Sequence, residues 1–177
     1  PAGTHGQTPA TSGTGKYKID AGYATTIYHG GAVASSAGYI IDGQTTDAPI
    51  LGVLNGIFYN AATTLKTTFA NFYKTPITPA NSEDVDAFVF DNPQQQYVVA
   101  TDAAVTQAGF LETYDMNTSA GSDTTGKSSS TLDTSETSAD GKQFRLIRSA
   151  EDPENEDITA AFFSGIVVSN LNSYNQV

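Results

Sequence analysis

The stretch Ile50-Leu-Gly-Val-Leu-Asn-Gly-Ile-Phe-Tyr59 contains two short apolar segments, 50–54 and 57–59, separated by Asn55-Gly56. Short apolar segments bounded by turn residues are typical of β-strands. Asn-Gly readily supplies the positive φ angles of a type I′ turn, which joins antiparallel strands. The stretch therefore predicts a β-hairpin with its turn at Asn55-Gly56.

The same pattern of short apolar segments continues along the chain. Gly30-Gly31, Asp42-Gly43 and Asp91-Asn92-Pro93 mark turns between the segments. A helix at 61–73 is an alternative, because the apolar residues there do not alternate cleanly. We expect an all-β fold, a small β-barrel or sandwich of short antiparallel strands. Further strands are predicted at 17–19, 25–28, 39–41, 65–73, 86–90, 97–101, 144–147 and 160–168.

Two parts of the chain have too few apolar residues to form core elements. Residues 1–16 are rich in Gly, Thr and Ser, which predicts an extended N-terminal arm. Residues 117–142 contain Leu132 as their single large apolar residue and predict a long polar loop, with a short strand at 129–132 as an option. The predicted organisation is an arm at 1–16 followed by one β-rich domain at 17–177.

The net charge of −11 over 177 residues is distributed unevenly. Residues 1–80 carry four lysines and three aspartates, so almost all of the excess acid lies in 81–177. An acidic chain opposes binding to nucleic acid, because such binding depends on Lys and Arg contacts with phosphates. No apolar segment reaches the roughly 20 residues needed to cross a bilayer. We expect neither a nucleic-acid nor a membrane partner, and synthesis in a cytoplasm with removal of the Met before Pro1.

Residues for catalysis or metal binding are scarce. The chain has no Cys and two histidines, His5 and His29, which is too few for a zinc site built on His and Cys. The acidic run 151–157 lacks the EF-hand pattern and is typical of a solvated turn, although calcium binding is an alternative. We therefore predict no catalytic residue, no metal site and no cofactor, and a protein that is not an enzyme.

Gly121-Ser-Asp-Thr-Thr-Gly-Lys-Ser128 matches the letters of a Walker phosphate loop. Such a loop connects a buried strand to a helix whose N-terminus faces the phosphates. The flanking residues 112–120 and 128–140 are too polar to form a buried strand and a packed helix. Nucleotide binding is therefore not expected.

Aromatic residues are the candidates for an interface. The chain has nine Tyr, nine Phe and no Trp. Clustered aromatic side chains supply enough apolar area to dominate an assembly contact. The predicted assembly-interface residues are Tyr17, Tyr23, Tyr28, Phe58, Tyr59, Phe69, Phe72 and Tyr73.

Several blocks, in this order, carry a resemblance to a known family. They are 17–33, 38–40, 50–59, Asp86-Ala-Phe-Val-Phe-Asp-Asn-Pro93, Gly126-Lys-Ser-Ser-Ser-Thr-Leu-Asp133 and Phe144-Arg-Leu-Ile-Arg-Ser-Ala-Glu-Asp-Pro-Glu-Asn-Glu156. Together they resemble a family of structural proteins from marine tailed phages, over most of residues 17–170. The chain departs from the family at Gly31, where an acidic residue usually follows Gly30.

The resemblance implies a capsid decoration or cement protein on the exterior of the virion. Similar proteins are small β-barrels at the threefold positions of the shell. The implied partners are the major capsid protein and other copies of the chain, in a trimer. The alternatives are a host-attachment or carbohydrate-binding spike or fibre component, and a virion hydrolase that would need two carboxylates about 5 to 10 Å apart across a cleft.

Overall fold

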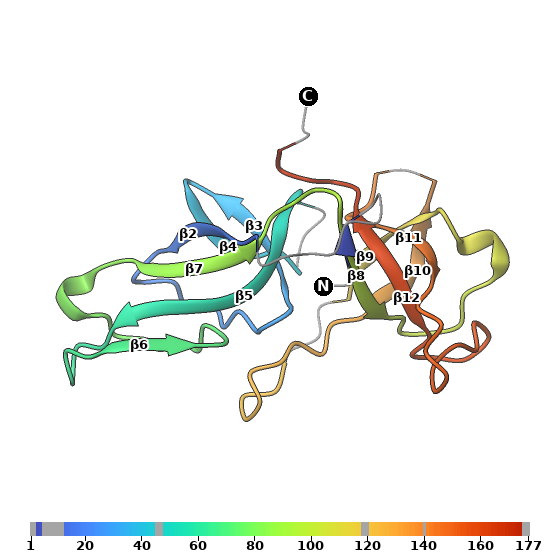
Figure 1. Cartoon of the computed structure of the whole chain (residues 1–177). Helices are drawn as coiled ribbons and strands as arrows, with labels where there is room; N and C mark the ends of the chain where they lie inside the picture. Colours follow the sequence, from blue (N-terminus) through green and yellow to red (C-terminus); the bar gives the residue numbers. More distant parts are fainter. Residues whose placement is uncertain (1–2, 5–12, 45–47, 118–120, 140, 175–177) are drawn as a thin grey trace.

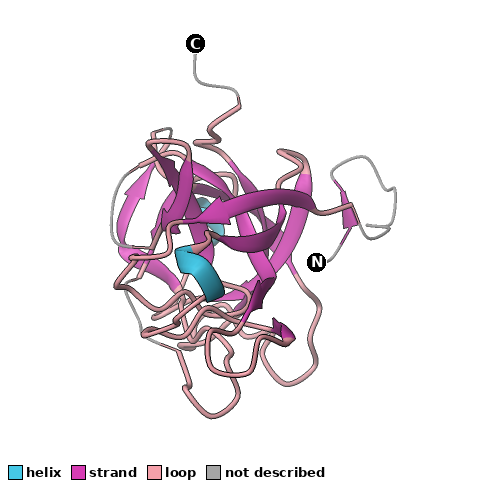
Figure 2. Ribbon diagram, turned by 90° about the vertical axis from the view of Figure 1, so that its left-hand side faces the viewer, coloured by secondary structure: helices cyan, strands magenta, loops and turns pink. Residues whose placement is uncertain are grey.

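The computed structural model describes residues 3–4, 13–44, 48–117, 121–139 and 141–174. Over these residues the chain forms two antiparallel sheets of six strands each (Figure 1). The two sheets pack as a sandwich. The all-β prediction is confirmed, and of its two options the sandwich is correct, because the sheets do not close into a barrel. Short 3₁₀ turns at Ala80–Ser82 and Gln107–Gly109 are the helical parts drawn in Figure 2.

The first sheet contains six consecutive strands of the chain. They are β2 (Gly15–Ile19), β3 (Ala32–Ser36), β4 (Tyr39–Asp42), β5 (Ile50–Asn60), β6 (Thr67–Ala70) and β7 (Val85–Phe90). The order is β2-β7-β5-β3-β4, and β6 pairs with β5. Strand β5 is the centre of this sheet, because β7 pairs with one of its sides while β3 and β6 share the other.

The hairpin predicted at Asn55-Gly56 is wrong, because these residues lie inside the continuous strand β5. The register against β7 shifts between Leu54 and Gly56, so the Asn-Gly pair forms a β-bulge. The helix considered at 61–73 is also absent, and strand β6 occupies 67–70. A tight turn does occur at Ala37-Gly38, where both φ angles are positive, at 49° and 87°.

The second sheet contains β1 (Gly3–Thr4), β8 (Gln95–Ala100), β9 (Thr113–Met116), β10 (Leu132–Ser138), β11 (Phe144–Ser149) and β12 (Ser164–Ser169). Their order is β1-β8-β12-β11-β9-β10. The predicted turn at 91–93 carries the chain from β7 in the first sheet to β8 in the second. The region 117–142 is not a simple loop, since it contains the seven-residue strand β10. Strand β9 had no counterpart among the predicted strands.

Some residues of the predicted extended arm at 1–16 take part in strand pairing. Gly3 and Thr4 pair with Gln96 and Gln95 at the edge of the second sheet, and Gly15 and Lys16 already belong to β2 in the first sheet. Residues 1–2 and 5–12 of the predicted arm lie outside the described residues. The part that is described is thus paired with both sheets.

Buried apolar residues form two clusters. The first lies on one face of the first sheet, which curls so that β2 and β4 approach one another without pairing. The second is built mainly from the second sheet, and it also receives Ala32 and Ile50 from the first sheet, with Val53 and Phe90 packed against it. The opposite face of the first sheet therefore splits into a covered end near Phe90 and an open end near Phe58.

Candidate binding surface and pocket

The eight aromatic residues predicted at an interface have different environments. Tyr73 is 1% exposed and belongs to the core, where its hydroxyl donates to the carbonyl of Tyr23 at 2.8 Å. Tyr23, Tyr17 and Tyr59 are half-buried against the same cluster. These four residues mainly stabilise the first sheet.

Tyr28 and Phe72 hold the segment 121–128, which we call the docked loop. Their rings stack with centroids 5.8 Å apart and planes 7° from parallel. The Tyr28 hydroxyl donates to Asp123 at 2.7 Å, and a Cβ added to Gly126 would lie 2.4 Å from the Phe72 ring. The side chains of Tyr28 and Phe72 are therefore already in contact with the docked loop of the same chain.

The backbone and neighbouring side chains reinforce this contact. The amide of His29 donates to the carbonyl of Gly126 at 2.8 Å, and the amide of Ser128 donates to the carbonyl of His29 at 2.9 Å. Lys74 forms an ion pair with Asp123 at 3.2 Å. The chain then continues into strand β10, where a phosphate loop would require a helix. The segment that matches the Walker pattern is thus a loop that packs against the first sheet.

Phe58 and Phe69 remain available on the surface. They are 36% and 64% exposed and lie directly opposite each other on β5 and β6. Phe88 on β7 adjoins them, with its ring centroid 6.4 Å from that of Phe69. Gly56 makes room for this arrangement, because a Cβ there would lie 2.9 Å from the Phe69 ring. We call Phe58, Phe69 and Phe88 the aromatic face.

Phe88 was absent from the predicted interface, although the period-two spacing in Asp86-Ala-Phe88-Val-Phe90 indicates its position. Val85, Ala87 and Val89 are fully buried, so the alternate residues of β7 point to the opposite face of the sheet. That alternation was the signal that could have identified it.

A group of charges borders the aromatic face. Asp86 forms ion pairs with Lys16 at 2.8 Å and with Lys18 at 2.6 Å. Burial alone would raise the pKa of the Asp86 carboxyl, but hydrogen bonds from the two ammonium groups hold this pKa below its usual value. The carboxylate is therefore charged at neutral pH, and the two lysines compensate its charge.

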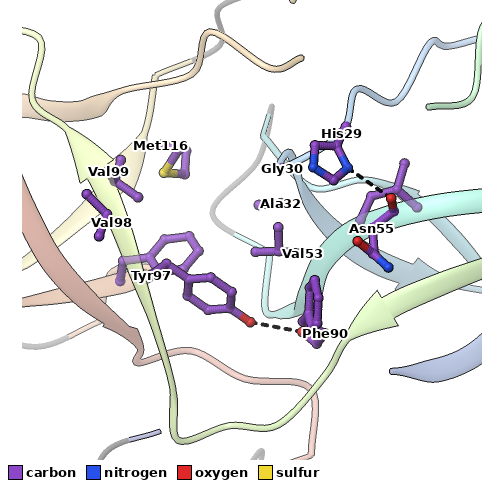
Figure 3. A pocket seen from close by; sticks show the side chains of 12 residues that line it. His29, Gly30, Ala32, Val53, Asn55, Phe90, Tyr97, Val98, Val99 and Met116 are labelled. Carbon is purple, nitrogen blue, oxygen red and sulfur yellow. Dashed lines mark hydrogen bonds between the residues drawn. The ribbon is translucent and has the colours of Figure 1, made fainter. Parts of the chain in front are cut away.

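An apolar pocket of about 210 Å³ lies between the two sheets at the covered end of the same face. Figure 3 shows β8 residues and Met116 on one side of it, and residues of the first sheet on the other. The lining residues are His29, Gly30, Ala32, Val53, Leu54, Asn55, Phe90, Tyr97, Val98, Val99, Met116 and Phe144.

Two hydrogen bonds organise the pocket wall. The Tyr97 hydroxyl donates to the carbonyl of Phe90 at 2.9 Å, and burial raises the pKa of this tyrosine, so it remains a protonated donor. Nδ1 of His29 lies 2.9 Å from the carbonyl oxygen of Asn55 (Figure 3). A carbonyl only accepts, so Nδ1 carries a proton, and Nε2 of the neutral ring is an acceptor.

Other chemistry is sparse in the part of the chain that the structure describes. There, no three His, Cys, Asp or Glu side chains gather into a group suited to a metal ion. The acidic turn 151–157 forms local hydrogen bonds instead, such as the Asn155 amide to Asp152 at 3.2 Å. Within the same described ranges, no helix has both the length and the apolar character to cross a membrane.

Comparison of the chain with protein-family models, curated proteins and solved structures finds no match. The fold defines the class as an antiparallel β-sandwich, and the candidate sites are the aromatic face and the pocket.

Proposed function

We propose that this chain is a structural protein of a phage virion, a decoration protein that binds the outer surface of the head shell and stabilises it by bridging capsomers. The resemblance of the sequence blocks to phage structural proteins supports the proposal that the chain is a virion component. The aromatic face supports a binding role. It is the observation on which the proposed attachment to the shell rests.

The aromatic face has the properties of an assembly contact. Single exposed apolar residues are common on protein surfaces, but adjacent aromatic rings are less so. Phe58, Phe69 and Phe88 come from three paired strands, so their positions are held by the sheet. Rigid aromatic groups lose little conformational entropy on binding and often dominate interface energies. The partner of this face in our proposal is the major capsid protein.

The distribution of charge supports an orientation on the shell. Residues 1–93 carry four basic and seven acidic side chains, whereas residues 94–177 carry four basic and twelve acidic ones. The boundary between the two sheets along the chain differs from the charge boundary at residue 80, because the four acidic residues within 83–91 lie in β7 of the first sheet or directly beside it. We propose that the first sheet faces the shell and that the more acidic second sheet faces solvent.

The same proposal includes further copies of the chain, arranged as a trimer on the shell, and no nucleic-acid or membrane partner. The protein would be made in the host cytoplasm and would reside on the capsid exterior. A trimer places three aromatic faces on one symmetric site, so three modest contacts together give a higher overall affinity than one.

The test is binding of purified protein to expanded capsids, measured by co-sedimentation. Phe69→Ser removes the most exposed ring of the aromatic face, and we expect at least tenfold weaker binding, the size typical of a hot spot. Phe162→Ser is the matched control, because Phe162 is similarly exposed, at 61%, but lies outside this face. It should bind as the unmodified chain does.

Equal binding by both variants would contradict the role of the aromatic face. Binding to host cells or to a glycan array, with none to capsids, would instead support the host-attachment alternative.

A further inference from the structure

The pocket between the sheets combines an apolar interior with polar groups at one edge. Ala32, Tyr97, Met116 and Phe144 are at most 8% exposed and form much of its wall. His29 and Asn55 lie together at one side (Figure 3). Ligand pockets typically have this composition, with few polar groups that orient a mostly apolar guest.

The size of the pocket restricts the guest. A cavity of about 150 Å³ lined by apolar residues is large enough for benzene. The present pocket, at about 210 Å³, has room for a small aromatic group, either one ring with a small substituent or a compact fused bicycle. Its walls already include the rings of Phe90, Tyr97 and Phe144, which favour edge contacts with another aromatic ring.

The polar edge specifies the substituent. Nδ1 of His29 is held by the Asn55 carbonyl, and Nε2 has no hydrogen-bond partner among the described residues. The Asn55 side-chain amide also has none within those residues, and it offers both a donor and an acceptor. A guest O–H or N–H can donate to Nε2, and a hydroxyl can also accept from the Asn55 amide, whereas a purely apolar guest makes neither hydrogen bond.

We propose that this pocket binds one small aromatic group bearing one hydrogen-bond donor, a phenol or an indole. The ring lies among Val53, Phe90, Val99 and Met116, and its O–H or N–H donates to Nε2 of His29. This site is separate from the capsid contact, so it stands whether or not that contact is correct. The ring can belong to a free small molecule or to a Tyr or Trp side chain of a partner.

The primary experiment titrates the full chain with p-cresol and with indole at pH 8, followed by amide chemical shifts and calorimetry. Toluene is the matched probe, since it has the shape of p-cresol without the hydroxyl. We expect p-cresol and indole to shift the amides of pocket residues with dissociation constants on the order of 1 mM. Toluene should bind several-fold more weakly.

Two variants make the test specific. His29→Phe keeps a ring but removes the acceptor. The affinity for p-cresol should therefore fall about fivefold, to that for toluene, and the affinity for toluene should not change. Val99→Phe fills the pocket and should abolish binding of all three probes. If Val99→Phe does not fold, the comparison of p-cresol with toluene on His29→Phe is decisive. Absence of shifts at pocket amides up to 10 mM, or binding unaffected by His29→Phe, would overturn the proposal.

A further arm separates the two sources of the ring. N-acetyltyrosinamide carries the same phenol with a peptide backbone. Binding comparable to p-cresol supports a side chain supplied by a partner, since the mouth then admits a main chain. Binding of p-cresol alone supports a free small molecule.

Discussion

Asp102 illustrates how one carboxylate joins two strands of the second sheet. It lies just beyond β8, and its Oδ1 accepts hydrogen bonds from the amide and hydroxyl of Thr134 on β10, at 2.9 and 2.8 Å. Asn117 donates to its other oxygen at 3.4 Å. Burial would raise the pKa of Asp102, but these donors hold it below the ordinary value.

The depressed pKa predicts a pH-dependent contribution to stability. This contribution is complete above the unfolded pKa of about 4 and is lost as the pH falls through the lower, folded pKa. Asp102→Ala should reduce the free energy of unfolding at pH 7 by about 1–3 kcal/mol, because several donors lose a charged acceptor. Urea denaturation at pH 7 and over pH 2–5 measures both effects, and the variant should show a weaker acid dependence.

The neighbouring Asp133 is the control for this change. Among the residues that the structure describes, its carboxylate accepts hydrogen bonds only from the amide and hydroxyl of Ser135, at 2.9 and 2.6 Å. Asp133→Ala should cost less than about 0.5 kcal/mol. If both variants lose equal stability, the cross-strand role of Asp102 is wrong.

Strand β5 is the element that organises the first sheet. Its apolar residues line the core cluster on one face, and the bulge at Asn55-Gly56 moves its second half into register with β6 and β7. Without that extra residue, Phe58 and Ile57 would exchange faces, since a one-residue shift turns every side chain of a strand over. The bulge therefore determines that Phe58 is exposed on the aromatic face.

Gly52 lies in the same strand where two backbones approach closely. A Cβ at this position would be 2.1 Å from the carbonyl oxygen of Phe90. Because the obstacle is backbone, relief would require a movement of β7 against β5. We predict that Gly52→Ala lowers the free energy of unfolding by about 1–3 kcal/mol, as measured by urea denaturation.

Gly22→Ala is the comparison for this position. Within the described part of the chain, a Cβ at Gly22 meets only the Asp20 side chain, at 3.1 Å, and that side chain is at the surface. The expected change is within about 0.5 kcal/mol. A Gly52→Ala protein as stable as the original would show that β7 shifts freely, against the packing described above.

At the scale of the whole molecule, the N-terminal segment connects the two sheets. Gly3–Thr4 pairs with β8 in the second sheet, and Gly15–Ile19 forms β2 in the first. Lys16 also forms an ion pair with Asp86. Truncation at different points should therefore have different consequences.

Deletion of residues 1–12 removes β1 but leaves β2 complete, so we expect a loss of about 1–2 kcal/mol in the free energy of unfolding, from the few pairing hydrogen bonds. Deletion of 1–16 also shortens β2 and removes the Lys16 ion pair, and should cost about 1–2 kcal/mol more. Denaturation in urea measures both, with the unfolding slope as a check on the extent of structure lost. Equal stability of the two truncated chains would contradict the assignment of Gly15 and Lys16 to β2.

The sequence by itself determined the all-β class and the approximate positions of several strands, such as β4, β7 and β11, which were predicted at 39–41, 86–90 and 144–147. These predictions succeeded because apolar alternation and turn residues act over a few neighbouring positions. The tertiary structure alone decided whether Asn55-Gly56 formed a turn or a bulge, because Asn and Gly can adopt both the positive φ angles of a type I′ turn and the strand conformation that they have in β5. Only contacts between distant residues could show that Tyr28 and Phe72 hold the docked loop, that Phe69 stays exposed, and that His29 borders a pocket.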